Sequence, residues 1–222
     1  SSLEFFFFIL RIAYVRIDFD RIHAGSIAST KGYSAAEPRW KVGGSLELRQ
    51  GLSILGATKS CGPGFVRCFN PGVVPPSFLN ADMTPSIARA SANVEFRPSP
   101  EFTLSFSPRA QLSPRALPAY EEFAAGAFTI GRGYDPSALS GDIAVGFASE
   151  ARLGSLVPAS QGGIAWQGFS FLDSAWLWDN FGGSTGNRQH LTSTGGGVRA
   201  VFGKRFRLET TLGVPLSRLS AF

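Results

Sequence analysis

Residues 40–54 alternate apolar and polar side chains, and this pattern restricts the fold more than any other feature of the chain. Such alternation places the two kinds of side chain on opposite faces of a β-strand. Its length exceeds the mode of about 5–6 residues for strands of globular proteins, but it suits a strand that crosses a bilayer in about 9–11 residues and continues beyond it. The apolar positions are Trp40, Val42, Leu46, Leu48, Leu52 and Ile54, and Gln50 is the polar interruption among them.

Similar patterns recur along the chain and predict eight strands without a helix. Besides residues 40–54, the expected strands are residues 10–19, 89–97, 102–112, 143–153, 164–178, 190–202 and 205–214. Pro98 and Pro100 mark a tight turn between the third and fourth strands, which therefore form a hairpin. Pro108 lies inside the fourth strand, where a proline removes one hydrogen bond of the ladder.

The connections between these strands alternate in length from the second strand onward. Long connections follow Leu55, Leu112 and Trp178, whereas short ones lie at Pro98, after Leu156 and at Gly203. Outer-membrane barrels have long external loops and short periplasmic turns, while a soluble β-sandwich has no reason to alternate in this way. The pattern therefore favours an all-β antiparallel meander of a membrane barrel, although the long connection before Trp40 breaks the rule.

Composition agrees with this fold class and excludes several functions. Only 17% of the residues are charged, and there is no apolar run near the roughly 18–20 residues of a membrane helix. The formal net charge is +5, but the arginines are scattered singly, so we expect no nucleic-acid partner. With His23 and His190 as the only histidines, we expect neither an enzyme nor a metal or other cofactor. Gly195–Gly197 lie in an expected strand, where glycine more often marks a bend than a phosphate site.

Cys61 and Cys68 are the only cysteines, and they are seven positions apart. Because neither histidine is nearby, a zinc site is not favoured. We expect a disulfide that closes a small outward loop, as is typical of an oxidising compartment.

Residues 113–142 form a long irregular segment between two expected strands. Structureless loops longer than about 12–15 residues are uncommon and are usually functional. Arg132 lies in this segment between Gly131 and Gly133, and Tyr134, Asp135 and Pro136 follow. If the segment folds against the sheet, Arg132 needs an anionic partner, because an unpaired buried charge is costly.

The run Thr129-Ile130-Gly131-Arg132-Gly133-Tyr134-Asp135-Pro136, followed by Leu139-Ser140-Gly141-Asp142, resembles the inward-folded sixth loop of TpsB transporters. These are the outer-membrane pores of two-partner secretion, known from haemolysin and filamentous-haemagglutinin export. The family's loop motif is Val/Ile-Arg-Gly-Phe/Tyr, and Gly131 departs from it. Phe171-Leu172-Asp173 matches the family's Phe-x-Asp motif on a later strand. The resemblance covers most of residues 8–216.

The resemblance implies specific roles for these residues. Asp173, in the same motif as Phe171, would face the lumen and hold Arg132. Independently of the resemblance, Glu150 is a second possible acceptor, because it lies on the polar face of the strand that leaves the loop. Gly131 and Gly133 allow the backbone conformation, while Tyr134 and Asp135 complete the loop motif and Tyr134 packs the loop tip against the wall.

The resemblance also implies an architecture and partners. Residues 1–222 would form about half of a 16-stranded outer-membrane barrel, with the family's POTRA domains and one closing strand outside this chain. Phe222 resembles the family's terminal aromatic residue, but Ser220 and Arg218 interrupt the apolar face before it. The partners would be a secreted TpsA-like exoprotein and the outer-membrane bilayer. We expect that this chain alone does not form a conducting pore.

Two other functions stay open at this point. One is a BamA-like factor for outer-membrane protein assembly, which the extension Leu139-Ser140-Gly141-Asp142 disfavours. The other is a small outer-membrane porin or enzyme, which would need a complete set of strands of its own.

Overall fold

The computed structural model describes residues 9–26, 32–160, 163–181, 184–185, 188–203 and 206–219. The expectation for Phe222 therefore lies outside the described residues. Within them the chain forms one large antiparallel sheet in which strands adjacent in the sheet follow one another along the chain. This confirms the predicted all-β antiparallel meander. The strands of the main sheet, in order of pairing, are β1 (Ile12–Ile22), β2 (Trp40–Gly51), β3 (Ser86–Ser99), β4 (Phe102–Leu112), β7 (Ile143–Gly154), β8 (Ile164–Trp178), β11 (Gln189–Phe202) and β12 (Phe206–Pro215).

Short elements complete the chain. Two 3₁₀ helices, η1 (Ala24–Ser26) and η2 (Pro63–Phe69), lie in the connections that flank β2. Two small hairpins are made by β5 (Phe123–Ala125) with β6 (Leu139–Gly141), and by β9 (Asn180–Phe181) with β10 (Ser184–Thr185). Among the described residues, no helix is long and apolar enough to cross a membrane.

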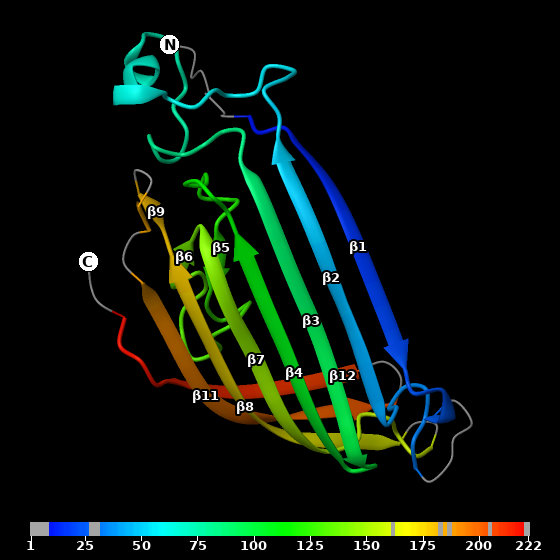
Figure 1. The fold of residues 1–222 in the computed structure, drawn as a ribbon. Helices are drawn as coiled ribbons and strands as arrows, with labels where there is room; N and C mark the ends of the chain where they lie inside the picture. Colours follow the sequence, from blue (N-terminus) through cyan, green and yellow to red (C-terminus); the bar gives the residue numbers. More distant parts are fainter. Residues whose placement is uncertain are drawn as a thin grey trace.

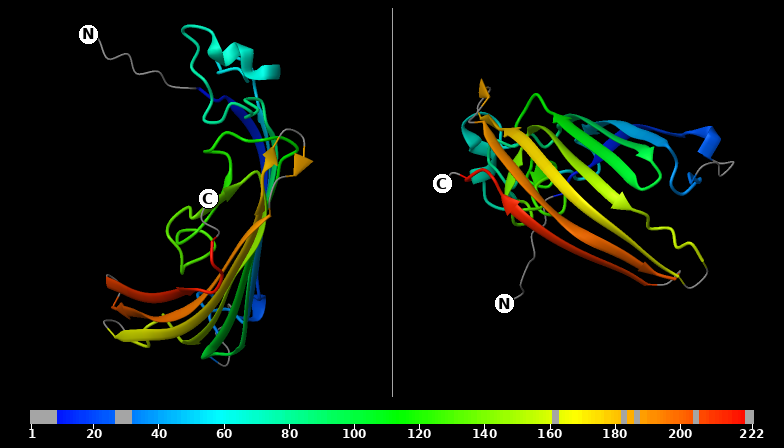
Figure 2. Two further views of the ribbon diagram at one scale, coloured as in Figure 1. Left: turned by 90° about the vertical axis from the view of Figure 1, so that its left-hand side faces the viewer. Right: turned by 90° about the horizontal axis from the view of Figure 1, so that it is seen from below.

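The main sheet is strongly curved, and the segment that carries β5 and β6 lies on its concave side (Figure 2). The connections of residues 52–85, 113–142 and 179–188 leave from one end of the sheet, and the turns after β3, β7 and β11 lie at the other (Figure 1). The described parts of the connection between β1 and β2, residues 23–26 and 32–39, lie at the end of the short turns (Figure 1), so the exception noted in the sequence is a feature of the fold.

The two faces of the sheet differ in chemistry as the alternation predicts. The convex face carries exposed apolar side chains from every strand of the sheet, among them Val15, Leu48, Phe106, Val145, Trp166, Val198 and Leu212. The concave face carries charged and polar side chains, including Glu47, Arg89, Glu150, Arg152, Asp173 and Arg199. Because burial of apolar surface away from water is favourable, the convex face suits contact with lipid.

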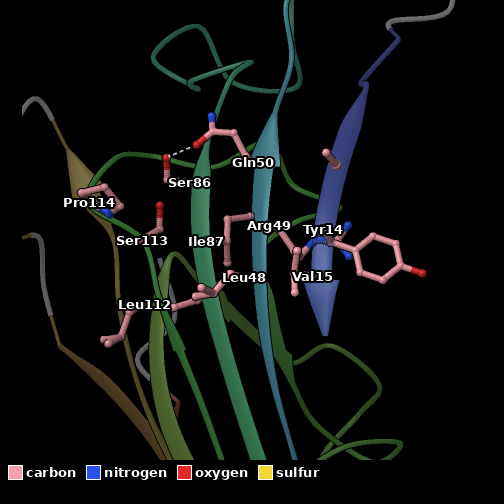
Figure 3. Close-up of a pocket in the computed structure, with 12 residues that line it drawn as sticks. Tyr14, Val15, Leu48, Arg49, Gln50, Ser86, Ile87, Leu112, Ser113 and Pro114 are labelled. Carbon is pink, nitrogen blue, oxygen red and sulfur yellow. Dashed lines mark hydrogen bonds between the residues drawn. The ribbon is translucent and has the colours of Figure 1, made fainter. Parts of the chain in front are cut away.

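Gln50, the polar interruption of the apolar face, lies at the end of β2. Its side-chain oxygen accepts a hydrogen bond from the Ser86 hydroxyl at 2.6 Å, and its amide donates to the Gly51 and Thr84 carbonyls at 3.0 and 3.1 Å. The two side chains border a shallow hollow of about 770 Å³ between β1 and β4 (Figure 3). Gln50 therefore satisfies the backbone where the strand ends, although the surrounding surface is apolar.

The predicted extension of the second strand to Ile54 is wrong, because β2 ends at Gly51. The Gly51 amide donates to the Pro85 carbonyl at 2.7 Å, and a Cβ at Gly51 would lie 2.5 Å from Pro85 Cδ. The chain then turns through Leu55, at φ 51°, and Gly56, at φ 74°. Leu52 and Ile54 continue the alternation, but β3 has not yet begun on the facing side.

Pro108 interrupts the pairing of β4 with β3, as its missing N–H requires. The ladder runs from Ala88↔Leu112 to Ser91↔Arg109 and resumes at Val94↔Phe106. Inside this gap the Ser107 hydroxyl donates to the Asn93 side-chain oxygen at 2.9 Å. A side-chain hydrogen bond thus bridges the place where backbone bonds are lost, while β4 stays paired with β7 at Pro108.

Cys61 and Cys68 form a disulfide at the end of the sheet that carries the long loops, with a Cα–Cα distance of 5.0 Å. The bond encloses most of η2, where Gly64 and Phe65 interrupt the helical conformation at φ 64° and 58°. The residues of η2 are not buried, so little packing other than this covalent link holds the segment.

We expect replacement of both cysteines by serine to loosen residues 61–69 without unfolding the sheet. The chain-entropy account gives about 2 kcal/mol for closing so short a loop. Limited proteolysis of the variant should show faster cleavage in this segment at an unchanged mobility of the folded protein on heat-modifiability gels. Equal cleavage rates with and without the disulfide would contradict this.

Candidate functional site

The segment of residues 113–142, here called the inner loop, folds against the concave face of the sheet. Its β5–β6 hairpin pairs Phe123 with Gly141 and Ala125 with Leu139. Figure 2 shows the inner loop inside the curve of the sheet. Arg132 lies between β5 and β6. The hairpin therefore places the Gly131-Arg132-Gly133 motif, which the sequence analysis singled out, on the concave side of the sheet.

The concave face of the main sheet is here called the wall. Apolar side chains from the inner loop and from this wall form a small core between them. Ile130 has no exposed surface and projects into this core, and Gly146 leaves room for it: a Cβ there would lie 3.0 Å from Ile130 Cδ1. Burying apolar surface holds the loop to the wall without any charge. The core residues are Ala125, Ile130 and Leu139 from the loop, and Ala144, Ala175, Leu177 and Leu191 from β7, β8 and β11.

Arg132 binds Asp173 through a two-pronged ion pair. Its Nε donates to Oδ2 at 2.9 Å and its Nη2 to Oδ1 at 2.7 Å. The backbone amides of Arg132 and Gly131 also donate to Oδ2, at 3.1 and 3.3 Å. Asp173 has no exposed surface. A buried carboxylate with four donors from one loop fixes both the position and the orientation of that loop.

Glu150 is the second carboxylate that receives Arg132, through Arg132 Nη1. Arg152 donates to Glu150 through Nε at 2.6 Å, and Arg199 donates through both Nη atoms at 3.0 and 3.1 Å. Three arginines therefore surround one carboxylate on β7. Because Arg152 and Arg199 belong to β7 and β11, Glu150 has two arginine partners on the sheet in addition to Arg132 of the inner loop.

The guanidinium groups of Arg132 and Arg199 lie over phenyl rings of β8. Arg132 is 3.9 Å from the centre of Phe171, and Arg199 is 3.9 Å from the centre of Phe169. A cation over an aromatic face is attracted by the ring's quadrupole. Each guanidinium group thus packs against the face of one phenyl ring of β8.

Glycines of β11 make room for these rings. Gly195 is paired with Phe171 and Gly197 with Phe169. A Cβ at Gly195 would lie 2.7 Å from Phe171 Cζ, and one at Gly197 would lie 2.9 Å from Phe169 Cζ. Each ring therefore lies across a position without a side chain, an arrangement by which aromatic residues stabilise glycines in sheets. Gly195 and Gly197 are thus packing positions for the two phenyl rings.

Gly131 and Gly133 allow the inner loop to approach the wall closely. Gly131 has φ 118°, and a Cβ there would lie 2.7 Å from Leu191 Cδ1. A Cβ at Gly133 would lie 2.7 Å from the Val214 carbonyl carbon and 2.9 Å from Ser193 Cβ. The departure from the aliphatic residue of the resembled motif, at Gly131, therefore fits the local geometry.

Tyr134 ties the tip of the inner loop to the last strands, whereas Asp135 does not take part. The Tyr134 hydroxyl lies 2.9 Å from the Thr192 carbonyl and 2.6 Å from the Ser217 carbonyl, and it accepts from the Ser217 amide at 3.1 Å. The side chain is half-buried against the apolar core. Asp135 is exposed, and its carbonyl accepts from the Ala138 amide at 3.3 Å.

Asp142 closes the inner loop at its far end. Its carboxylate accepts from the Leu117 amide at 2.6 Å and the Asn180 amide at 2.7 Å. Burial raises the pKa of Asp142, and burial together with the charge of Asp142 raises the pKa of Asp179. Glu122 lines a hollow together with Asp142 and Asp179, and burial is the main cause that raises the pKa of Glu122. Among the residues that the structure describes, no group of three or more His, Cys, Asp or Glu side chains is placed to hold a metal ion.

Sequence patterns pointed to Arg132, Asp173 and Glu150, and the structure brings all three together with Phe171. They did not indicate Arg152, Arg199 or the glycine–phenylalanine pairs. Arg152 has the same parity as Glu150, so it could have been placed on the same face. Arg199 and Gly195 become neighbours of the site only through the register of β11 against β8.

Comparisons with known proteins agree with this fold at the level of structure alone. No family model and no curated protein matches the sequence. Among solved structures, CdiB from Escherichia coli is similar, with a TM-score of 0.61 and 17% sequence identity. The match covers 81% of this chain and 30% of CdiB, so this chain spans less than a third of the length of that neighbour.

We expect Gly195→Ala to disrupt the site while Gly168→Ala does not. A Cβ at Gly195 collides with the Leu212 carbonyl and with the ring under Arg132, whereas Gly168, on β8, has nothing within 4 Å of the added atom. Overpacking of this kind costs about 1–3 kcal/mol. Thermal unfolding of the two variants in detergent should show a lower midpoint for Gly195→Ala alone, and equal midpoints would refute the packing argument.

We expect Asp179→Asn to raise the thermal stability of the folded protein at neutral pH. Since the pKa of Asp179 is raised in the folded state, its ionisation opposes folding above that pKa and has no effect below the unfolded value of about 4. The gain in unfolding midpoint over wild type should therefore shrink as the pH falls from 7 towards 4. A gain that is constant or grows on acidification would contradict the assignment.

Proposed function

We propose that this chain forms part of the wall and the lumenal plug of an outer-membrane pore that exports a large partner protein in unfolded form. The concave face would line the pore, and the inner loop would close it. The convex face, with its exposed apolar side chains, would lie in the lipid bilayer. The barrel would contain further strands beyond those of this chain, sixteen in all if it follows the resembled family.

The observation that carries the proposal is the buried fork between Arg132 and Asp173, assisted by Glu150. A loop held to the inner wall by charge pairs can be released as a unit, since a guanidinium that leaves one carboxylate regains solvation in a water-filled lumen. The apolar core around Ile130 adds affinity without fixing the orientation. The ion pairs of Arg132 are thus the contacts that hold this part of the loop in one orientation on the sheet.

The similarity in fold to CdiB, a transporter of two-partner secretion, supports the same proposal. By analogy, the exported partner would be a large secreted protein encoded with the transporter. Its extended chain would pass along the polar concave face, where side chains such as Ser45, Ser91, Asn93, Ser105 and Ser107 offer weak contacts. Transport of this kind needs no catalytic residue in the chain, and we propose none.

We expect Arg132→Ala in the full-length protein to open the pore and to alter secretion. Removing one partner of a buried pair costs about 3–5 kcal/mol. Asp173 has no exposed surface in the structure, and the substitution removes the cation that pairs with it. Planar-bilayer recordings should show a higher open probability, and the amount of partner protein in the medium should change.

Arg109→Ala is the matched control, because Arg109 is an exposed arginine on the concave face of β4 and, among the described residues, forms no ion pair with Asp173 or Glu150. Its conductance should equal that of wild type. Unchanged conductance and secretion in Arg132→Ala would count against the plug. Loss of assembly of other outer-membrane proteins, with secretion intact, would instead favour the BamA-like alternative.

A further inference from the structure

Glu121, in the inner loop, forms a second set of ion pairs, with arginines of β2 and β3 rather than with the strands that bind Arg132. Its side chain is 5% exposed. One carboxylate oxygen lies 2.7 Å from Arg49 Nη2, and the other lies 2.9 Å from Arg89 Nη2. Arg49 is on β2 and Arg89 is on β3, so two neighbouring strands hold one loop carboxylate. This group of three residues is here called the Glu121 clamp.

The wall orients the two arginines of the Glu121 clamp independently of the loop. The Glu47 carboxylate lies 3.1 Å from Arg49 Nη1 and 3.8 Å from Arg89 Nη1. Arg89 Nε also donates to the Gln111 side-chain oxygen at 2.7 Å. One wall carboxylate is shared by two arginines, which leaves positive charge directed at the place where Glu121 lies.

The wall also binds the backbone carbonyl of Glu121. The Gln111 side-chain amide donates to the Glu121 carbonyl at 3.0 Å, and Arg89 Nη2 donates to that carbonyl at 2.9 Å. Gln111 is almost fully buried. Side chain and main chain of Glu121 are therefore both fixed to the wall, which is more than a solvated surface ion pair provides.

The polarity of this clamp is the reverse of that at Arg132. At Arg132 the loop supplies the cation, and β7 and β8 supply the carboxylates. At Glu121 the loop supplies the carboxylate, and β2 and β3 supply the cations. A loop attached only at Arg132 could swing away about its other end, whereas two attachments on different strand pairs prevent that motion.

We propose that Glu121 is a second anchor of the inner loop, and that the pore opens fully only when the Glu121 clamp and the Arg132 contacts are both released. The proposal rests on the plug function proposed above and adds a positioning residue to it. Release of one anchor permits a partial displacement of the loop. Release of both is required for the loop to leave the concave face.

The test compares Glu121→Gln, Arg132→Ala and the double variant of the full-length protein in planar bilayers. Each single variant should raise the open probability at least about tenfold, because loss of one partner of a buried pair exceeds the roughly 1.4 kcal/mol that corresponds to a factor of ten. The double variant should stay open for most of the recording. A Glu121→Gln pore that matches wild type while Arg132→Ala opens would overturn the proposal.

Glu122→Gln is the matched control, since it makes the same chemical change one residue away and, among the described residues, Glu122 forms no ion pair with Arg49 or Arg89. It should leave the open probability unchanged. An increase equal to that of Glu121→Gln would mean that loss of any loop carboxylate opens the pore, which would also overturn the proposal. Glu121→Asp keeps the charge but is one methylene shorter, so a smaller increase is expected, and this variant decides the question if Glu121→Gln does not fold.

Trypsin cleavage after Arg115 gives a second readout that does not depend on conductance. The Arg115 side chain is 73% exposed at the start of the inner loop. Glu121→Gln should speed this cleavage several-fold, and the control Glu122→Gln should not. If wild type neither conducts nor secretes, the plug function fails, while faster cleavage would still support the anchor. Equal cleavage in all variants would refute the anchor.

Discussion

The cost of an unpaired charge away from bulk water governs the arrangement on the concave face. Asp173 has no exposed surface and Glu150 little, and Arg132 satisfies both while its guanidinium lies over Phe171. Each of these groups would be expensive to bury alone. The inner loop therefore completes an electrostatic site that the sheet supplies only in part, and this site acts together with the apolar core around Ile130 to keep the loop inside the curve of the sheet.

The strands that hold this site present an apolar face and a charged face, because apolar and polar side chains alternate along each strand. One face is apolar from β1 to β12, and the other carries arginines and carboxylates that pair with one another across strands. Glycines at Gly195 and Gly197 let Phe171 and Phe169 lie flat against β11, which places ring faces beneath Arg132 and Arg199. The position of the Arg132 and Arg199 guanidinium groups thus depends on glycines of β11, the strand paired with β8.

Much of the fold could be predicted from the sequence because alternation is a local signal. The eight strands of the main sheet and the long inner loop follow from it. The strand ends do not, since β1 runs to Ile22 and β2 stops at Gly51 beside Pro85, and the short elements η1, η2, β5, β6, β9 and β10 carry no alternation that predicts them. The pairing of Arg132 with Asp173 could be predicted only from the resemblance to a known motif. The ion pairs of Glu121 could not be predicted, because nothing in its local sequence shows that Arg49 and Arg89 face it. That contact follows from the register of β2 with β3 and the path of the loop.

A double-mutant cycle between Arg132 and Asp173 tests the central claim most directly. Open probabilities of wild type, Arg132→Ala, Asp173→Ala and the double variant of the full-length protein give the coupling free energy between the two side chains in the closed state. Residues that share one ion pair show coupling of about 0.5–3 kcal/mol. A closed state held by this fork predicts a coupling above about 1 kcal/mol, with the double variant little different from either single one. Additive effects, within about 0.5 kcal/mol, would show that the fork does not hold the loop in the closed state.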